Sequence, residues 1–268
     1  MSVLMTSLKD GVFTITLNRP EKRNSWNGEM EGELRTAFIE ATENSDVRVV
    51  VLTGSGAAFC AGADTEFLRK LQSGEASLTA HEGDPWPDAR AEFKGKFAMP
   101  AAVPKPVIAA LNGPAVGIGF VLALYCDIRL GAQSAAFIGS FSRMGLIAEK
   151  GIDWALSGIV GQGRATEILL SGRKVSAEEA ERYGLISAVY PDDDFVGAVH
   201  AYAAEMASKV SPRSAKVIKR QLQSVRFDTP ADILARGEKE LAASIQSADF
   251  QEAIAAMREK RAPMYPGL

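Results

Sequence analysis

The same order of elements, an apolar strand, a glycine-containing loop and a helix, occurs three times in the first half of this chain. The three strands are expected at 12–17, 47–52 and 107–111, and the loops follow Leu17, Leu52 and Leu111. Segment 12–17, VFTITL, alternates between two faces, whereas 47–52, VRVVVL, is nearly continuous in apolar residues, which is typical of a strand covered on both sides. The repetition predicts an α/β fold of stacked copies of one unit. The copies share no sequence identity, so only the architecture repeats.

Further elements lie between and after these units. More strands are expected at 126–131, 136–139 and 186–190. One helical face is formed by apolar residues spaced three and four apart, namely Trp26, Met30, Leu34, Ala37, Phe38 and Ala41. The sequence Ser176-Ala-Glu-Glu179 has the form of a capping box, and we expect Gly184 to end the short helix that it opens. Segment 72–100 is polar and interrupted by prolines, so it predicts a long excursion with a helical part near 88–98.

From Asp192 onward strands cease and helical patterns cover 196–210, 211–225 and 230–261. We therefore predict two regions, a core over 1–191 and a helical region over 192–268.

Composition limits the class of protein. With 268 residues, of which 47% are hydrophobic and 24% charged, the chain can bury a large core. A net charge of −3 does not point to nucleic acid, and no apolar run approaches the ~18 residues of a membrane span. The first residues lack the pattern of a secretion signal, and Cys60 and Cys126 form no CxxC pair. We expect a cytoplasmic protein without a metal, since no HExxH or paired-cysteine spacing occurs.

Two glycine-rich loops are the candidate site. In 112–127, NGPAVGIGFVLALYCD, a helix is expected to begin near Gly117 to Gly119, which leaves the N–H groups of Ile118 and Gly119 without helical partners. Loop 54–64 has the same character, with a helix from about Asp64. Two such loops after neighbouring strands can direct one amide each at the same oxygen and stabilise an enolate or a tetrahedral oxyanion. The alternative is that small residues only allow close packing of helix on strand.

A nucleotide site is a weaker interpretation. The run from Gly117 begins like GxGxxG, but Leu122 stands where the third glycine belongs, and no GxxxxGK[ST] loop occurs. A nicotinamide-dependent dehydrogenase is therefore not favoured.

Four blocks carry a family resemblance: 17–26, LNRPEKRNSW; 49–68, VVVLTGSGAAFCAGADTEFL; 105–132, KPVIAALNGPAVGIGFVLALYCDIRLGA; and 141–161 followed by 165–191, ATEILLSGRKVSAEEAERYGLISAVYP. In this order they resemble the crotonase, or enoyl-CoA hydratase/isomerase, superfamily. The resemblance implies a crotonase-like spiral of ββα repeats with a C-terminal α-helical trimerisation region, assembled as a homotrimer or as a hexamer of two trimers. It also implies an acyl-CoA substrate, with coenzyme A as part of the thioester and no separate cofactor.

By the same resemblance, the thioester oxygen accepts hydrogen bonds from the N–H groups of Ala63 and Ile118. Ala61, Asp64 and Gly117 lie in the same two loops and are implied to line the substrate site. Ile118 departs from the family, which usually has glycine there. The backbone donor is kept, and the isoleucine side chain is expected to narrow the space near the thioester.

Cations and polar residues are implied to bind coenzyme A. Arg19, Lys22 and Asn24 fall where the family shapes the coenzyme A pocket, and Lys22 is a candidate for a phosphate or the adenine edge. Lys260 and Arg261 lie where relatives often place a cation near the 3′-phosphate. The alternatives are a solvated turn for the first three and a charged surface helix for Lys260.

The residues that move protons in typical hydratases of the family are missing. The family uses two glutamates, and this chain has Val121 at the first position and Phe141 in the Ser140-Phe141 pair at the second. Neither side chain can transfer a proton. Glu149 stands where dienoyl-CoA isomerase relatives carry an acidic catalytic residue, and one carboxylate suffices to carry a proton between two carbons. The alternative is a helix-start residue favoured by the helix dipole.

The sequence thus favours an acyl-CoA enzyme that stabilises a thioester enolate and shifts a double bond. An unusual enoyl-CoA hydratase, a 3-oxoacyl hydrolase and a C–C lyase stay open, because relatives use the same oxyanion geometry for several reactions. A non-catalytic protein that binds coenzyme A thioesters or takes part in assembly is the alternative of another class.

Overall fold

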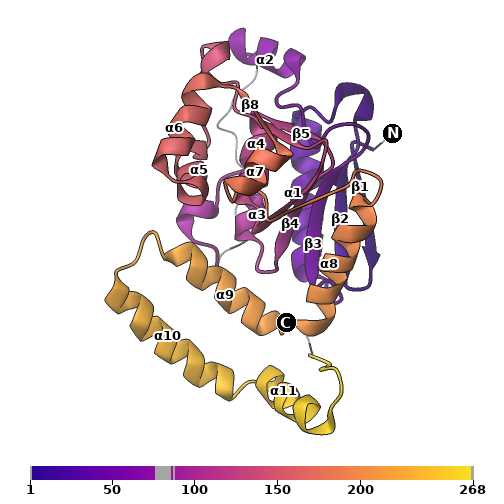
Figure 1. The fold of residues 1–268 in the computed structure, drawn as a ribbon, viewed down its shortest axis with the longest axis vertical. Coiled ribbons are helices and arrows are strands. Elements are labelled where there is room, and N and C mark those ends of the chain that lie inside the picture. The colour runs from indigo at the N-terminus through magenta and orange to yellow at the C-terminus, as the bar shows by residue number, and fades with distance from the viewer. Residues whose placement is uncertain (1, 76–85, 87, 267–268) are drawn as a thin grey trace.

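A computed structural model describes residues 2–75, 86 and 88–266 of the chain. Its centre is a six-stranded sheet in the order β1-β2-β3-β4-β6-β9 (Figure 1). The strands are β1 (Leu4–Lys9), β2 (Val12–Leu17), β3 (Val49–Gly54), β4 (Val107–Leu111), β6 (Ile128–Ala132) and β9 (Ala188–Tyr190). Within this sheet only β1 and β2 pair antiparallel, and all other neighbours pair parallel. This confirms the predicted α/β class.

A smaller sheet of three strands stands beside the main one. Its members are β5 (Pro114–Val116), β7 (Ala136–Ile138) and β8 (Lys174–Ser176), in the order β5-β7-β8. The predicted strands 12–17 and 107–111 have the predicted bounds, whereas β3 begins at Val49 rather than at residue 47. β1, β5 and β8 were not predicted.

The main sheet is covered on both faces, as the sequence of β3 predicts. Val50 and Leu52 belong to the larger core cluster, which also contains the buried face of α1 (Gly28–Glu43). Val49 and Val51 point to the other face and pack with α8 (Phe195–Lys209). A strand buried on both sides needs apolar residues at successive positions, which explains the unbroken VVVL run.

The remaining helices of the core are short. They are α2 (Thr65–Gln72), α3 (Met99–Ala102), α4 (Ile118–Tyr125), α5 (Ile152–Val160), α6 (Gln162–Ser171) and α7 (Ala177–Arg182). The capping box at Ser176 is confirmed, and α7 ends two residues before Gly184, whose φ is 72°. Within the predicted helical part near 88–98 only a 3-10 turn forms, at Ala91–Phe93. Much of the excursion, residues 76–85 and 87, lies outside the described residues.

The chain ends in α9 (Pro212–Ser224), α10 (Pro230–Ile245) and α11 (Ala248–Glu259), which reach beyond the sheet (Figure 1). The helical stretch expected over 230–261 is interrupted because Ser247 starts a new helix, its hydroxyl accepting the Phe250 N–H. The predicted boundary at 192 falls just before α8, which packs on the sheet, and the division into two regions stays a prediction. In the part of the chain described, no helix combines the length and apolar character needed to span a membrane.

Candidate functional site

The two glycine-rich loops lie directly against each other. Cys60 and Ala115 form a parallel bridge, in which the Cys60 N–H donates to Pro114 O (3.3 Å) and the Val116 N–H donates to Cys60 O (2.9 Å). At Gly119 a Cβ atom would lie 2.5 Å from the Cys60 carbonyl oxygen, so only glycine allows this approach. The structure therefore brings together the loops that the sequence singled out separately.

Ala63 is held by the backbone of Trp26. The Trp26 N–H donates to Gly62 O (2.7 Å), and the Asp64 N–H donates to Trp26 O (2.9 Å). Since both bonds use the neighbours of Ala63, the N–H of Ala63 itself points away from Trp26. It donates no hydrogen bond among the described residues.

Helix α4 begins at Ile118, as expected. Gly117 precedes it with φ 51° and ψ −112°, and the first N–H to bond back within the helix is that of Val121, to Gly117 O (3.0 Å). The N–H groups of Ile118, Gly119 and Phe120 have no acceptor within the described part of the chain. They lie at the positive end of the helix dipole. The Ile118 side chain is 6% exposed and packs into the main core.

Asn24 fastens the turn after β2 to the first loop. Its side chain is fully buried: Nδ2 donates to the carbonyl oxygens of Ser55 (2.9 Å) and Ala58 (2.8 Å), and Oδ1 accepts the Arg19 N–H (2.8 Å). A solvated turn is therefore the wrong description of Asn24. Its polar atoms hold the loop in place.

Arg19 and Asp64 form an ion pair beside Ala63, with 2.9 Å between Nη2 and Oδ2. Asp64 also caps α2, since its Oδ1 accepts the Glu66 N–H (3.0 Å). Burial opposes the charged form, but the bond from Glu66 and the Arg19 guanidinium together lower the pKa of Asp64 below its usual range. Ala61, whose N–H donates to Arg23 O (2.9 Å), lies in the same group of contacts.

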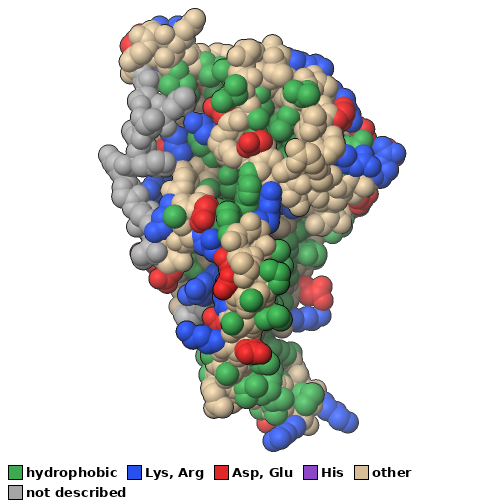
Figure 2. All heavy atoms as spheres, turned by 90° about the vertical axis from the view of Figure 1, so that its left-hand side faces the viewer, with side chains coloured by type: hydrophobic (Ala, Val, Ile, Leu, Met, Phe, Trp, Pro, Cys, Tyr) green, Lys and Arg blue, Asp and Glu red, His purple; other side chains and the backbone are tan. Residues whose placement is uncertain are grey.

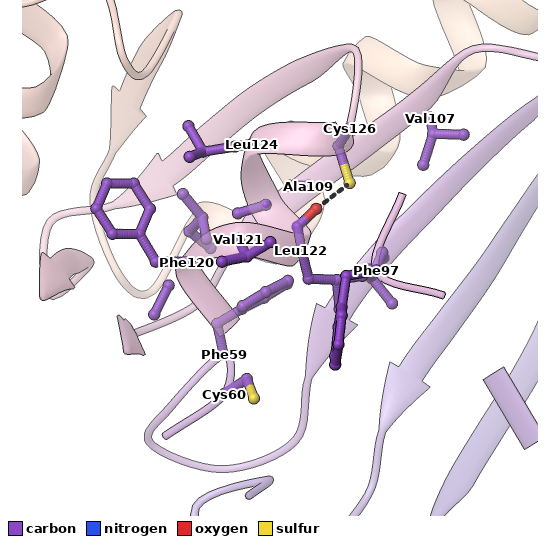
Figure 3. Packing of buried hydrophobic residues seen from close by; sticks show 14 of the residues in the cluster. Phe59, Cys60, Phe97, Val107, Ala109, Phe120, Val121, Leu122, Leu124 and Cys126 are labelled. Atoms are coloured by element: carbon purple, nitrogen blue, oxygen red, sulfur yellow. Dashed lines mark hydrogen bonds between the residues drawn. The ribbon is translucent and has the colours of Figure 1, made fainter. Parts of the chain in front are cut away.

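The two positions of the missing glutamates are buried in the apolar core. Val121 is 0% and Phe141 5% exposed. Figure 3 shows Val121 on α4 among apolar side chains from other segments, including Phe59 and Phe97. These positions contribute packing and no proton transfer.

Glu149 lies in the turn before α5. Its side chain is 28% exposed, and Oε2 is 3.9 Å from Lys150 Nζ. Lys150 Nζ is 5.7 Å from the centre of the Phe97 ring, which in turn lies 5.2 Å from the Trp26 ring. Contacts therefore connect the Glu149 turn with the residue that holds Ala63.

Two predicted coenzyme A contacts are at the surface. Lys22 is exposed at the end of a 3-10 turn, Pro20–Lys22, near the Arg19 and Asp64 pair. Lys260 is exposed at the end of α11, which lies at the opposite end of the long axis from α2 (Figure 1). Within one chain the structure does not bring Lys260 to the two loops.

Cys60 is not set up as a nucleophile. Burial raises the pKa of its thiol to about 11, so the thiolate is disfavoured. Over the described residues no group of three or more His, Cys, Asp and Glu side chains is arranged to hold a metal ion.

The sequence did not single out the aromatic residues that support the site. Phe97 comes from the excursion and packs on Trp26, and Tyr125 ends α4 with its hydroxyl on Lys150 O at 3.0 Å. The only signal for Tyr125 was its place as the last residue of an apolar run before Cys126-Asp127.

Comparison with known proteins gives one consistent family. The family model for enoyl-CoA hydratase/isomerase matches residues 7–267. A 1,2-epoxyphenylacetyl-CoA isomerase from Escherichia coli (strain K12) is 34% identical over 270 residues, with 100% of this chain and 99% of the relative covered. A probable enoyl-CoA hydratase from Rhodobacter capsulatus is 39% identical over 262 residues, with 97% and 96% covered. The crystal structure of enoyl-CoA hydratase from Mycobacterium tuberculosis H37Rv matches with a TM-score of 0.88 at 28% identity, covering 100% of both chains.

Proposed function

The chain belongs to the enoyl-CoA hydratase/isomerase family and is an enzyme acting on acyl-CoA, and from this premise we propose that it moves a double bond within the acyl group. Its fold is the crotonase fold that the sequence blocks implied. The observation that carries the proposal is the burial of Val121 and Phe141 in the core. Of the three positions at which members of the family carry a catalytic acid, only position 149 has one in this chain, and Glu149 is partly exposed.

In the proposed reaction the thioester oxygen accepts hydrogen bonds from the N–H groups of Ala63 and Ile118. These donors stabilise the negative charge that develops when the C–H bond at the α carbon breaks. Glu149 takes that proton, the electron pair delocalises onto the thioester oxygen, and the double bond moves as Glu149 returns the proton to the γ carbon. No water and no further cofactor take part, because coenzyme A arrives as part of the substrate.

Hydration is the second candidate. Relatives with similar identity are named as probable hydratases, whereas another is named as an isomerase. Hydration needs a water to be oriented and deprotonated while the α carbon is protonated. The apolar residues at positions 121 and 141 remove the carboxylates that would share this work, which favours isomerisation.

The test is Glu149→Gln, with Glu178→Gln on the exposed side of α7 as the matched control. Wild type and the control are expected to convert a 3-enoyl-CoA into a 2-enoyl-CoA, and the Glu149→Gln variant is expected to lose at least about 10²-fold in kcat. Equal turnover in the variant would remove Glu149 from the mechanism. Net hydration of a 2-enoyl-CoA would favour the hydratase, and binding of thioesters without any conversion would favour a non-catalytic protein.

We infer that the remaining predicted residues shape and bind coenzyme A. Arg19, Asn24 and Asp64 hold the first loop, and Ala61 and Gly117 flank the two donors. Lys22 is the candidate for a phosphate at the pocket rim. Because Lys260 stands at the far end of its own chain, we propose that it serves a substrate bound to a neighbouring copy (Figure 1).

We propose that the chain assembles as a homotrimer or as a hexamer of two trimers. Helix α10 has no buried residue in the single chain, yet it carries Leu234 and Leu241, which are 70% and 61% exposed. Figure 2 shows apolar side chains gathered over this end of the molecule. Such a surface is typical of a subunit interface. Light scattering is expected to give three or six times the chain mass of 28.6 kDa, and a monomer at all concentrations would contradict the assembly.

A further inference from the structure

The turn that follows Glu149 has an unusual backbone. Lys150 and Gly151 both adopt positive φ, 59° and 74°. Positive φ is uncommon for a residue with a side chain, and it persists where surrounding contacts fix it. Glu149 is therefore attached to a turn whose shape depends on its neighbours.

Tyr125 is the neighbour that fixes this turn. Its hydroxyl donates to Lys150 O at 3.0 Å, and a Cβ atom on Gly151 would lie 2.4 Å from the same hydroxyl oxygen. Burial is the larger cause and the Asp153 carboxylate the smaller one that raise the pKa of the Tyr125 hydroxyl. The hydroxyl therefore stays protonated and able to donate. The aromatic ring lies edge-on to Phe93, with 6.5 Å between centres.

The same helix carries the oxyanion donor. Helix α4 has eight residues, with the free N–H of Ile118 at its start and Tyr125 at its end, about 10 Å apart along the axis. Seven of its eight residues are buried, so close packing holds the two ends of the helix at fixed places relative to each other. It therefore links the place of the Ile118 N–H at one end with the place of the Glu149 turn at the other.

We propose that Tyr125 is a positioning residue, which holds the Glu149 turn at a fixed distance from the oxyanion donor through the Lys150 carbonyl and the close approach to Gly151. This inference rests on the proposed function of Glu149. As a positioning residue Tyr125 acts through the Lys150 carbonyl, so we expect it to affect the rate of proton transfer and to leave thioester binding in place.

The first test is Tyr125→Phe, which removes only the hydroxyl. We expect kcat for the double-bond shift to fall about tenfold or more, because small misplacements of a reacting group are costly. KM and the Kd of a non-reactive acyl-CoA are expected to stay within about twofold of wild type, because the Ile118 end of α4 is unchanged. If Tyr125 had only a structural role, Tyr125→Phe would lower kcat by no more than it weakens acyl-CoA binding. An unchanged kcat would overturn the proposal.

A rescue experiment makes the test independent of simple destabilisation. Gly151→Ala places a methyl group 2.4 Å from the Tyr125 hydroxyl, whereas the next Tyr125 atom, Cζ, lies 3.7 Å away. The double variant with Tyr125→Phe and Gly151→Ala removes that clash. We expect Gly151→Ala alone to lose more activity than the double variant, whose kcat should approach that of Tyr125→Phe. Losses that multiply would show two independent effects and would overturn the proposal.

The Glu149→Gln variant separates this inference from the proposed function. Where Glu149→Gln keeps its turnover, the proposed function fails and the positioning role fails with it. Where Glu149→Gln loses turnover and Tyr125→Phe keeps a wild-type kcat, only the positioning role fails. Loss of kcat in both variants, with rescue of Gly151→Ala by Tyr125→Phe, is the result expected here.

Discussion

The Cys60 carbonyl oxygen occupies the space directly beside Gly119: a Cβ atom there would lie 2.5 Å from that oxygen and 2.7 Å from the Cys60 Cβ. The start of α4 therefore approaches the first glycine loop at backbone distance. This approach brings the segment that carries the Ile118 N–H against the segment that carries the Ala63 N–H. A side chain at position 119 would force them apart.

Gly119→Ala is expected to lower kcat/KM by about 10²–10³-fold, the effect of losing one oxyanion donor in other enzymes. The matched control is Gly163→Ala in α6, where a Cβ atom meets nothing within 4 Å. Steady-state kinetics with a 3-enoyl-CoA checks the prediction. Equal kinetics in the two variants would mean that the close approach at Gly119 does not matter for catalysis.

Val121→Glu is expected to destabilise the protein and to gain no hydratase activity. Val121 is 0% exposed, so the new carboxyl group would lie in the apolar core at a cost on the order of 3 kcal/mol or more. Val196→Glu in α8 is the control, because Val196 is 78% exposed. Thermal unfolding of the two variants should separate them clearly, and a Val121→Glu protein as stable as the control would contradict the packing described here.

Because Arg19 and Asp64 form an ion pair, we expect the free energy of unfolding to differ between wild type and Asp64→Asn by an amount that depends on pH. Because the native pKa of Asp64 is lowered, its stabilising effect is present above the ordinary carboxyl value near 4 and is lost as pH falls through the native value. Asp64→Asn keeps a capping residue on α2 and removes the charge. Chemical unfolding should give wild type an advantage of about 1–2 kcal/mol at pH 7 that shrinks toward pH 3. A difference that is constant with pH would exclude a contribution from the ion pair.

The lowered pKa of Lys105 predicts that the free energy of unfolding rises with pH in the alkaline range. Its side chain is 3% exposed, and Nζ donates to the carbonyl oxygens of Ala41 (2.8 Å) and Asn44 (2.7 Å). Burial, and after it the Arg48 charge, lowers the pKa of Lys105 to about 8. Between that value and the unfolded value near 10.4, the unfolded chain binds more protons, so stability rises with pH.

The measurement compares the free energy of unfolding of wild type and Lys105→Met from pH 7.5 to 9.5. Wild type is expected to gain on the order of 1–2 kcal/mol relative to the variant across this range. Parallel curves for the two proteins would show that Lys105 has the same proton affinity folded and unfolded.

The sequence predicted those features that depend on local chemistry. The apolar run of β3 predicted a strand covered on both faces, and the glycines at 117 and 119 predicted the start of α4, which begins at Ile118. Small residues in both loops predicted a close approach, and the bridge between Cys60 and Ala115 is that approach.

Features that depend on distant partners were missed. β5 and β8 have three residues each, and they exist only because β7 pairs with both. Asn24 lies in a polar turn of the sequence, so its full burial follows only from contacts with a loop more than 30 residues away. The bond from Tyr125 to Lys150 spans 25 residues and leaves no periodic signal. The start of α11 does have a local signal, because Ser247 is a good N-cap residue.

On the proposed function, the N–H groups of Ala63 and Ile118 bind one thioester oxygen. The most direct test is a crystal structure of the Glu149→Gln variant with a bound 3-enoyl-CoA. We predict that the thioester oxygen lies about 2.7–3.1 Å from both backbone nitrogens. A thioester oxygen that contacts water or side chains, with either N–H turned to another acceptor, would contradict it.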